Sequence, residues 1–191
     1  MSRIPSDPDS VLIARVMAGD DRHAFAELVR RHQSAVRSLL CRLCLNDAAF
    51  ADDLAQETFI QVHKKLRQFR GDAKFSTWLY RIAYNVFLSH ARSGHANAVA
   101  AEEPLMEAHF AEQIHPSPGA GAALKMDLEK AMATLSEGER AAIVQCYFHD
   151  LSHEEAAYAL DCPLGTVKTN VLRAKQKLKA LLSAWAPATS E

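Results

Sequence analysis

Side chains that can read DNA bases gather near the C-terminal end of the chain. Val167, Val171, Ala174, Leu178 and Leu181 recur at intervals of four and three residues, which predicts one buried side of a helix. At about 100° per residue, the opposite face carries Thr169, Leu172, Arg173 and Gln176, flanked by Lys168, Lys177 and Lys179. These groups suit hydrogen bonds to base edges and ion pairs with phosphates. The alternative is an ordinary solvated helix end, whose basic residues complement the helix dipole.

The residues before this helix predict the element that would position it. Ser152 and Glu155 have the spacing of a capping box, as do Ser136 and Glu139, so a short helix should run over residues 152–160. A tight turn at Asp161-Cys162-Pro163 follows, and proline suits the first turn of the next helix. A short helix, a tight turn and a longer helix form the outline of a helix-turn-helix.

Other chemistry finds little support. The carboxylate pairs Asp52/Asp53 and Glu154/Glu155 are adjacent in sequence and cannot share a helical face, and no phosphate loop or nucleophile motif is present, so we expect no enzyme. Four cysteines predict small apolar side chains rather than disulfides. A metal or redox role for Cys41-x-x-Cys44 with nearby histidines stays a minor alternative, and no metal or cofactor is expected.

Composition and charge place the chain among ordinary cytoplasmic globular proteins. It has 191 residues, 49% of them hydrophobic, with no secretion signal and no apolar run long enough for a membrane span. The net charge is only −1, but residues 127–161 hold eight acidic and two basic residues, whereas residues 162–191 hold five basic and one acidic. An acidic block therefore directly precedes a basic one.

Helical spacing of apolar residues also fills the N-terminal half. It predicts helices over residues 10–19, 21–45, 48–69 and 76–93, with breaks at 46–47 and 70–72. Proline, glycine and alanine then replace the pattern until about residue 123, although residues 102–114 could hold a short helix. We therefore expect an all-α chain of two small domains: an N-terminal helical bundle over 1–95, a flexible linker over 96–123, and a C-terminal helix-turn-helix domain over 124–191.

Three motifs stand in order along the chain. The first is Asp53-Leu-Ala-Gln-Glu-Thr-Phe59, and the second is Phe75-Ser-Thr-Trp-Leu-Tyr-Arg-Ile-Ala-Tyr-Asn85. The third lies in the helix-turn-helix, where Pro163-x-Gly165-Thr166-Val167-Lys168 precedes Arg173-Ala174. Together they resemble one family, the RNA polymerase sigma factors of the extracytoplasmic-function (ECF) subfamily of the sigma-70 family, and the resemblance covers nearly the whole chain outside the linker and the ends.

The resemblance implies a role for each motif. The first would bind core RNA polymerase through Asp53, Gln56 and Glu57. The second, with the preceding loop, would recognise and melt the −10 promoter element through Arg70, Asp72, Lys74, Phe75, Tyr80, Arg81, Tyr84 and Asn85. Trp78 lies on the apolar stripe and is predicted to belong to the core rather than to a stacking platform. The third would bind the −35 element through Thr166, Lys168, Thr169, Asn170, Arg173, Gln176 and Lys177.

The resemblance further implies an alternative sigma factor that is monomeric on polymerase and acts in a stress or envelope response under the control of an anti-sigma factor. It would be cytoplasmic, and a membrane-bound anti-sigma factor could hold it at the inner membrane. Ser89, Arg92-Ser93 and Asn170 depart from the family's usual residues, which leaves the promoter sequence open. Two other functions stay open. One is a sigma-like adaptor that sequesters an anti-sigma factor without driving transcription, and the other is a stand-alone DNA-binding repressor.

Overall fold

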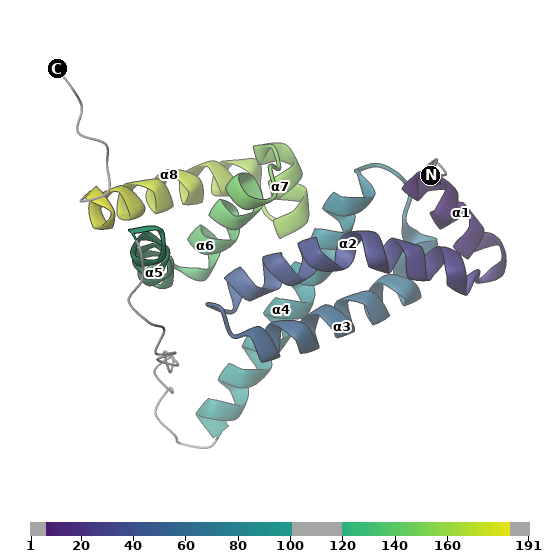
Figure 1. Cartoon of the computed structure of the whole chain (residues 1–191), viewed down its shortest axis with the longest axis horizontal. Coiled ribbons are helices and arrows are strands. Elements are labelled where there is room, and N and C mark those ends of the chain that lie inside the picture. The colour runs from purple at the N-terminus through teal and green to yellow at the C-terminus, as the bar shows by residue number, and fades with distance from the viewer. Residues whose placement is uncertain (1–6, 101–119, 184–191) are drawn as a thin grey trace.

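The computed structural model describes residues 7–100 and 120–183, and within these ranges every regular element is a helix (Figure 1). The all-α prediction is confirmed. None of the helices in the described ranges is long and apolar enough to cross a membrane.

Four α-helices build the N-terminal half. They are α1 (Asp9–Gly19), α2 (Arg22–Leu43), α3 (Ala48–Lys65) and α4 (Phe75–Ala100), with a short 3₁₀ turn, η1 (Leu66–Gln68), after α3. Helices α2, α3 and α4 pack against one another, and α1 packs on α2. Their facing sides bury leucine and valine side chains completely, as the apolar spacing predicts.

Short polar side chains fix where these helices begin. The carboxylate of Asp21 accepts hydrogen bonds from the amides of His23 and Ala24, and that of Asp47 accepts one from Phe50. The predicted break between α2 and α3 is confirmed, with Leu45 and Asn46 both at positive φ. The predicted start of α1 is wrong, because Pro8 and not Ser10 occupies the N-cap.

The C-terminal half holds α5 (Ala120–Ala133), α6 (Glu137–Ile143), a π-helical turn η2 (Val144–Phe148), α7 (His153–Leu160) and α8 (Leu164–Leu181). Both predicted capping boxes are present, and they begin α6 and α7. Each satisfies helix amides that would otherwise lack partners, which typically contributes about 1 kcal/mol. Pro163 caps α8 rather than entering its first turn.

The helices flanking the linker extend further than the sequence pattern predicts. Helix α4 continues to Ala100, past Gly94, and α5 begins at Ala120. Alanine-rich sequence favours helix, and one glycine costs only about 1 kcal/mol. The rest of the predicted linker and the predicted helix over residues 102–114 lie outside the described residues.

The two halves share one continuous buried core. Helix α4 packs against α7, and α2 contacts both η2 and α6 (Figure 1). All four cysteines are free thiols, and the described ranges hold no cluster of histidine, cysteine and acidic residues that could bind a metal ion. The halves therefore contact each other directly as well as through the chain that joins them.

His149 makes this packing sensitive to pH. Burial, and next the charge of Arg42, lower the pKa of the His149 imidazole from 6.5 to about 4, while Asp150 acts in the opposite direction. The His149 imidazole is therefore protonated near pH 6.5 in the unfolded chain, but only near pH 4 in the folded chain. Stability that is present above pH 6.5 is lost as the pH falls through this window.

We predict that the free energy of unfolding falls between pH 7 and pH 5 by about 2 kcal/mol more in the wild type than in His149→Gln. Urea unfolding of both proteins at each pH measures the difference, and the variant serves as the control for all other titrating groups. Equal losses in the two proteins would contradict the assignment.

Candidate functional site

The C-terminal site is a helix-turn-helix whose second helix presents a polar face. Helix α7 ends at Leu160, its C-cap Asp161 is in the left-handed conformation at φ 51°, and this reversal lets α8 start three residues later, at Leu164. Val167, Val171 and Ala174 are buried as predicted. The opposite side of α8 is exposed, so its polar groups are available to a partner.

Five of the seven predicted −35 residues lie on this exposed side: Thr166, Lys168, Thr169, Arg173 and Gln176. Leu172 stands among them with 58% of its surface exposed, and it can offer an apolar contact beside the polar groups. Thymine methyl groups are the apolar feature of the DNA major groove. The helical spacing had placed Leu172 on this face, although it carries no hydrogen-bonding group.

The other two predicted −35 residues face α6. Asn170 is half-buried with its side-chain amide against Gly138, where a Cβ atom would meet it at 3.0 Å. The Lys177 ammonium donates to Glu139 Oε2 over 2.7 Å. This hydrogen bond, followed by the Ser136 amide, lowers the pKa of the Glu139 carboxyl. Both residues therefore have a role in holding α8 to α6.

The second region lies at the start of α4. The loop residues Arg70, Asp72 and Lys74 are exposed, and Gly71 at φ 78° supplies the turn between them. Phe75 is buried in an aromatic cluster with Phe69, Trp78 and His32, at centroid distances of 5.7, 5.8 and 5.2 Å. Trp78 is half-buried and packs against the core at the beginning of the helix, which agrees with the prediction.

The remaining predicted −10 residues differ in exposure. Asn85 is exposed and Arg81 is half-buried, but Tyr80 and Tyr84 are each only 7% exposed. The resemblance implies DNA contacts for these two tyrosines, which would need exposed rings. The C-terminal half covers them, and no spacing rule within α4 could reveal that contact.

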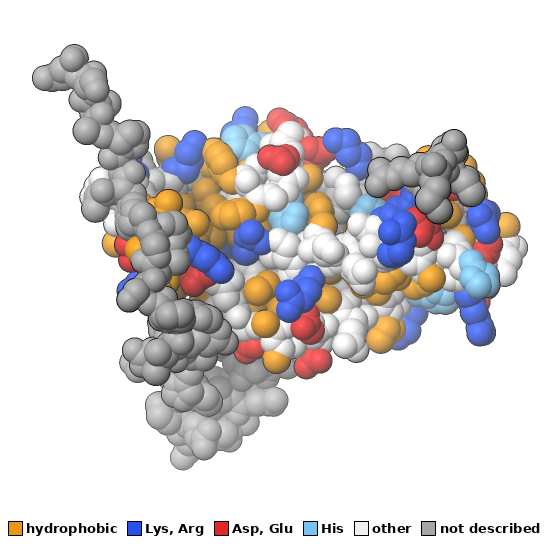
Figure 2. Space-filling model, viewed as in Figure 1, with side chains coloured by type: hydrophobic (Ala, Val, Ile, Leu, Met, Phe, Trp, Pro, Cys, Tyr) orange, Lys and Arg blue, Asp and Glu red, His pale blue; other side chains and the backbone are white. Residues whose placement is uncertain are grey.

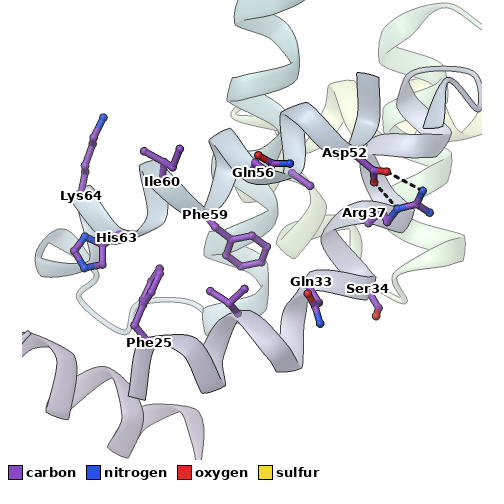
Figure 3. A pocket seen from close by; sticks show the side chains of 12 residues that line it. Phe25, Gln33, Ser34, Arg37, Asp52, Gln56, Phe59, Ile60, His63 and Lys64 are labelled. Carbon is purple, nitrogen blue, oxygen red and sulfur yellow. Dashed lines mark hydrogen bonds and ion pairs between the residues drawn. The ribbon is translucent and has the colours of Figure 1, made fainter. Parts of the chain in front are cut away.

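The third region is an open groove between α2 and α3, with a volume of about 810 Å³ (Figure 3). Phe25 and Phe59 project into it from opposite helices, and Ile60 is 48% exposed beside them. At one end, Arg37 Nε donates to Asp52 Oδ1 over 2.5 Å, and this bond lowers the pKa of the Asp52 carboxyl. The groove combines an apolar floor with charged ends, which suits a protein helix.

The predicted polymerase-binding residues meet this groove unequally. Gln56 lines it, whereas Asp53 is exposed outside it and Glu57 accepts a hydrogen bond from Gln61 over 2.6 Å. Sequence reasoning found the polar residues of α3 but missed the aromatic floor. The signal was present in Phe25 and Phe59, but both lie at the helical spacing of apolar residues, which is typical of a buried side.

Comparison with known proteins adds a family to this geometry. The family model for Sigma-70 region 2 matches residues 28–96, and the model for Sigma-70 region 4 matches residues 125–178. The RNA polymerase sigma-H factor of Pseudomonas aeruginosa is 34% identical over 188 residues, covering 94% of this chain and 96% of that protein. The ECF RNA polymerase sigma-E factor of Escherichia coli K12 is 35% identical over 182 residues, covering 89% and 92%.

This chain belongs to the ECF sigma factors of the sigma-70 family. As a sigma factor it carries region 2 on α2, α3 and α4, where the groove and the start of α4 lie, and region 4 on α5 to α8. The family consists of transcription factors and is not a class of enzymes. The resemblance inferred from the three motifs is confirmed.

Solved structures agree with this family membership. The sigma factor RpoE from Bartonella quintana, in complex with the anti-sigma factor NepR, matches with a TM-score of 0.71 and 28% identity over 83% of this sigma factor and 96% of that chain. CnrH, in complex with the cytosolic domain of CnrY, matches with a TM-score of 0.65 and 26% identity over 94% and 100%. Both matches extend across the two halves of the fold.

The ion pair between Glu139 and Lys177 predicts a stability effect within region 4. Glu139→Gln keeps a side chain that can complete the capping box but removes the charge opposite Lys177. We expect the free energy of unfolding to fall by about 1–2 kcal/mol in urea titrations. Glu154→Gln, which changes an exposed residue of α7, should change it by less than about 0.5 kcal/mol. An equal effect of the two substitutions would refute the predicted contribution of the pair.

Proposed function

We propose that this chain directs promoter-specific transcription by binding core RNA polymerase through the α2/α3 groove and promoter DNA through α4 and α8. The observation that carries the proposal is that one chain holds both a groove suited to a protein helix and a helix with an exposed base-reading face. The activity is binding and strand opening rather than catalysis, and it needs no cofactor.

The groove supports the first step of this proposal. Its aromatic floor and the exposed Ile60 offer the kind of buried anchor that dominates protein interfaces. Gln56 at its edge and Asp53 beside it supply polar groups around that anchor. A helix from the coiled coil of the largest polymerase subunit is the proposed occupant, with Glu57 supporting the polar edge.

The two DNA steps use different chemistry. Arg173 and Gln176, with Thr169, would read base edges of the −35 element in the major groove, while Lys168 and Thr166 would contact phosphates. Arg70, Asp72, Lys74, Arg81 and Asn85 would hold the opened −10 strand, with Tyr80 and Tyr84 stacking on bases once they are exposed. Asn170 and Lys177 would then contribute through the position of α8, and Phe75 through the position of the loop.

Free protein should bind DNA poorly. The net charge is −1. On the face of the molecule that Figure 2 shows, basic and acidic side chains are interspersed and do not form one continuous basic patch. Non-specific affinity comes mostly from phosphate neutralisation, so neither DNA-binding half provides enough alone. Core polymerase would fix the spacing of the two halves. Once one half is bound to the promoter, the other half would then be at a high effective concentration near its own DNA element.

We propose the same division into domains that the sequence predicts, with the N-terminal domain ending at about residue 95 and the C-terminal domain beginning at about residue 124.

We also propose an anti-sigma factor as the regulatory partner. Two of the similar solved structures are complexes, one of them with a named anti-sigma factor. A membrane-bound partner of this kind would hold the protein at the inner membrane until a signal releases it. The rival function, an adaptor that only sequesters an anti-sigma factor, would not need the exposed polar face of α8.

Binding to core polymerase tests the groove. Ile60→Lys places a charge on an exposed apolar residue, so the fold should persist while affinity for purified core polymerase falls at least about 30-fold. The matched control is Val11→Lys, which changes an equally exposed apolar residue on α1. If both variants bind core polymerase as tightly as the wild type does, the groove is not the docking site.

Replacement of Arg173 tests the −35 contact separately. Arg173→Ala should keep wild-type affinity for core polymerase but lower the affinity of the reconstituted enzyme for its promoter by about 1–3 kcal/mol, with relaxed preference at one base pair. Promoter-library binding measures both quantities. Lys130→Ala, which changes an exposed lysine of α5 outside the proposed DNA-binding face, is the control. An unchanged base preference would remove Arg173 from the reading face.

A further inference from the structure

The most exposed large apolar side chain in the described part of the chain lies in the middle of the polar face of α8. Leu172 has 58% of its surface exposed, whereas Val167, Val171 and Ala174 on the opposite side of the helix are buried. Leu172 therefore takes no part in the region 4 core. A single exposed leucine is common on protein surfaces, so its neighbours on the helix decide whether it belongs to a binding surface.

Thr169 adds a second apolar group to this face. Its hydroxyl donates to the backbone oxygen of Gly165 over 2.9 Å, one turn earlier in the helix. A threonine hydroxyl has a single hydrogen, so this bond leaves Thr169 with no donor for a partner, while its methyl group stays available on an exposed residue. Residues three apart lie on the same face of a helix, with Cβ atoms about 5–6 Å apart. Thr169 and Leu172 therefore form one apolar strip.

Cations border the apolar strip. Lys168 and Arg173 are both exposed, and within residues 7–100 and 120–183 neither makes a hydrogen bond or an ion pair. An apolar protein surface would leave these two charges without partners, whereas the DNA major groove offers apolar and anionic groups side by side. The apolar group on its base edges is the C5-methyl of thymine, and phosphates line both rims. The apolar strip and its cations therefore fit thymine in duplex DNA better than an apolar protein partner.

The spacing of the apolar strip matches neighbouring base pairs. Three residues of an α-helix rise about 4.5 Å, and successive base pairs of DNA are stacked about 3.4 Å apart. Thr169 and Leu172 can therefore reach the methyl groups of two adjacent base pairs. Gln176 is exposed one turn further along the same face, and its amide suits adenine. The three side chains in a row thus fit consecutive A·T pairs.

We propose that Thr169 and Leu172 determine part of the promoter specificity by contacting the C5-methyl groups of thymine in two adjacent base pairs of the −35 element. The inference rests on the proposed function of α8 and names the base that this part of the helix reads. It assigns the reading role of Thr169 to its methyl group and not to its hydroxyl, which is bonded to Gly165. Cytosine lacks the methyl group, so G·C pairs bind less well at these two positions.

Deoxyuridine tests this contact, because it lacks only the C5-methyl of thymine and pairs with adenine in the same way. The DNA is a promoter that polymerase reconstituted with the full chain selects from genomic DNA, with each −35 thymine on either strand replaced singly. We expect the affinity of the wild-type complex to fall about three- to tenfold at two neighbouring base pairs. Leu172→Ala should lose the response at one of them. Leu181→Ala, which changes another exposed leucine of α8, is the control and should respond as the wild type does.

Two substitutions of Thr169 separate its methyl group from its hydroxyl. Thr169→Ser keeps the hydroxyl that bonds to Gly165 and removes the methyl group, whereas Thr169→Val keeps a methyl group and removes the hydroxyl. Both change an exposed residue, so the fold should persist. The serine variant should lose the response to deoxyuridine at the second base pair, and the valine variant should keep it. The opposite result would show that the hydroxyl reads the base and would overturn the role of the methyl group.

The remaining outcomes distinguish this inference from the proposed function. A −35 element without A·T pairs, unchanged affinity at every deoxyuridine, or equal responses of the wild type and Leu172→Ala would overturn methyl reading. In each of these cases the complex still binds a promoter, so the proposed function stands. A reconstituted polymerase that selects no promoter would refute the proposed function, and the inference with it.

Discussion

Helix α4 is the element on which the rest of the structure depends. One of its sides completes the region 2 core with α2 and α3, and another packs against α7 of region 4. Its start is fixed by the aromatic cluster around Phe75 and Trp78, and this cluster also sets the position of the exposed loop at residues 70–74. A single helix therefore positions the proposed strand-opening loop and the contact between the halves.

Region 4 carries its acidic residues and its basic residues on different surfaces. Region 4 places its acidic residues on and before α7, where Glu155 and Asp161 meet cations of region 2. Its basic residues lie on α8, and the exposed side of that helix points away from its own core. The proposed −35 face is thus exposed. Of the proposed −10 residues, Tyr80 and Tyr84 are covered, whereas Arg70, Asp72, Lys74 and Asn85 are exposed.

Local sequence predicted the elements well because local physics determines them. The capping boxes at Ser136 and Ser152 and the stripe from Val167 to Ala174 depend on residues within one or two turns of one another. The burial of Tyr80 and Tyr84, the turning of Lys177 toward Glu139 and the groove between α2 and α3 depend on packing between distant segments. Periodicity within a helix carries no information on that packing. The sequence therefore predicted the helices and their buried sides better than it predicted which polar and aromatic residues would be accessible.

Reconstituted transcription tests the central claim most directly. Purified core RNA polymerase would be combined with this protein, and transcripts from total genomic DNA would be mapped by run-off sequencing. The account predicts discrete start sites that share two spaced upstream elements and that vanish when either component is left out. If no protein-dependent start sites arise while a cellular pull-down recovers an anti-sigma factor, the chain is an adaptor, and the DNA-binding roles proposed for α4 and α8 are wrong.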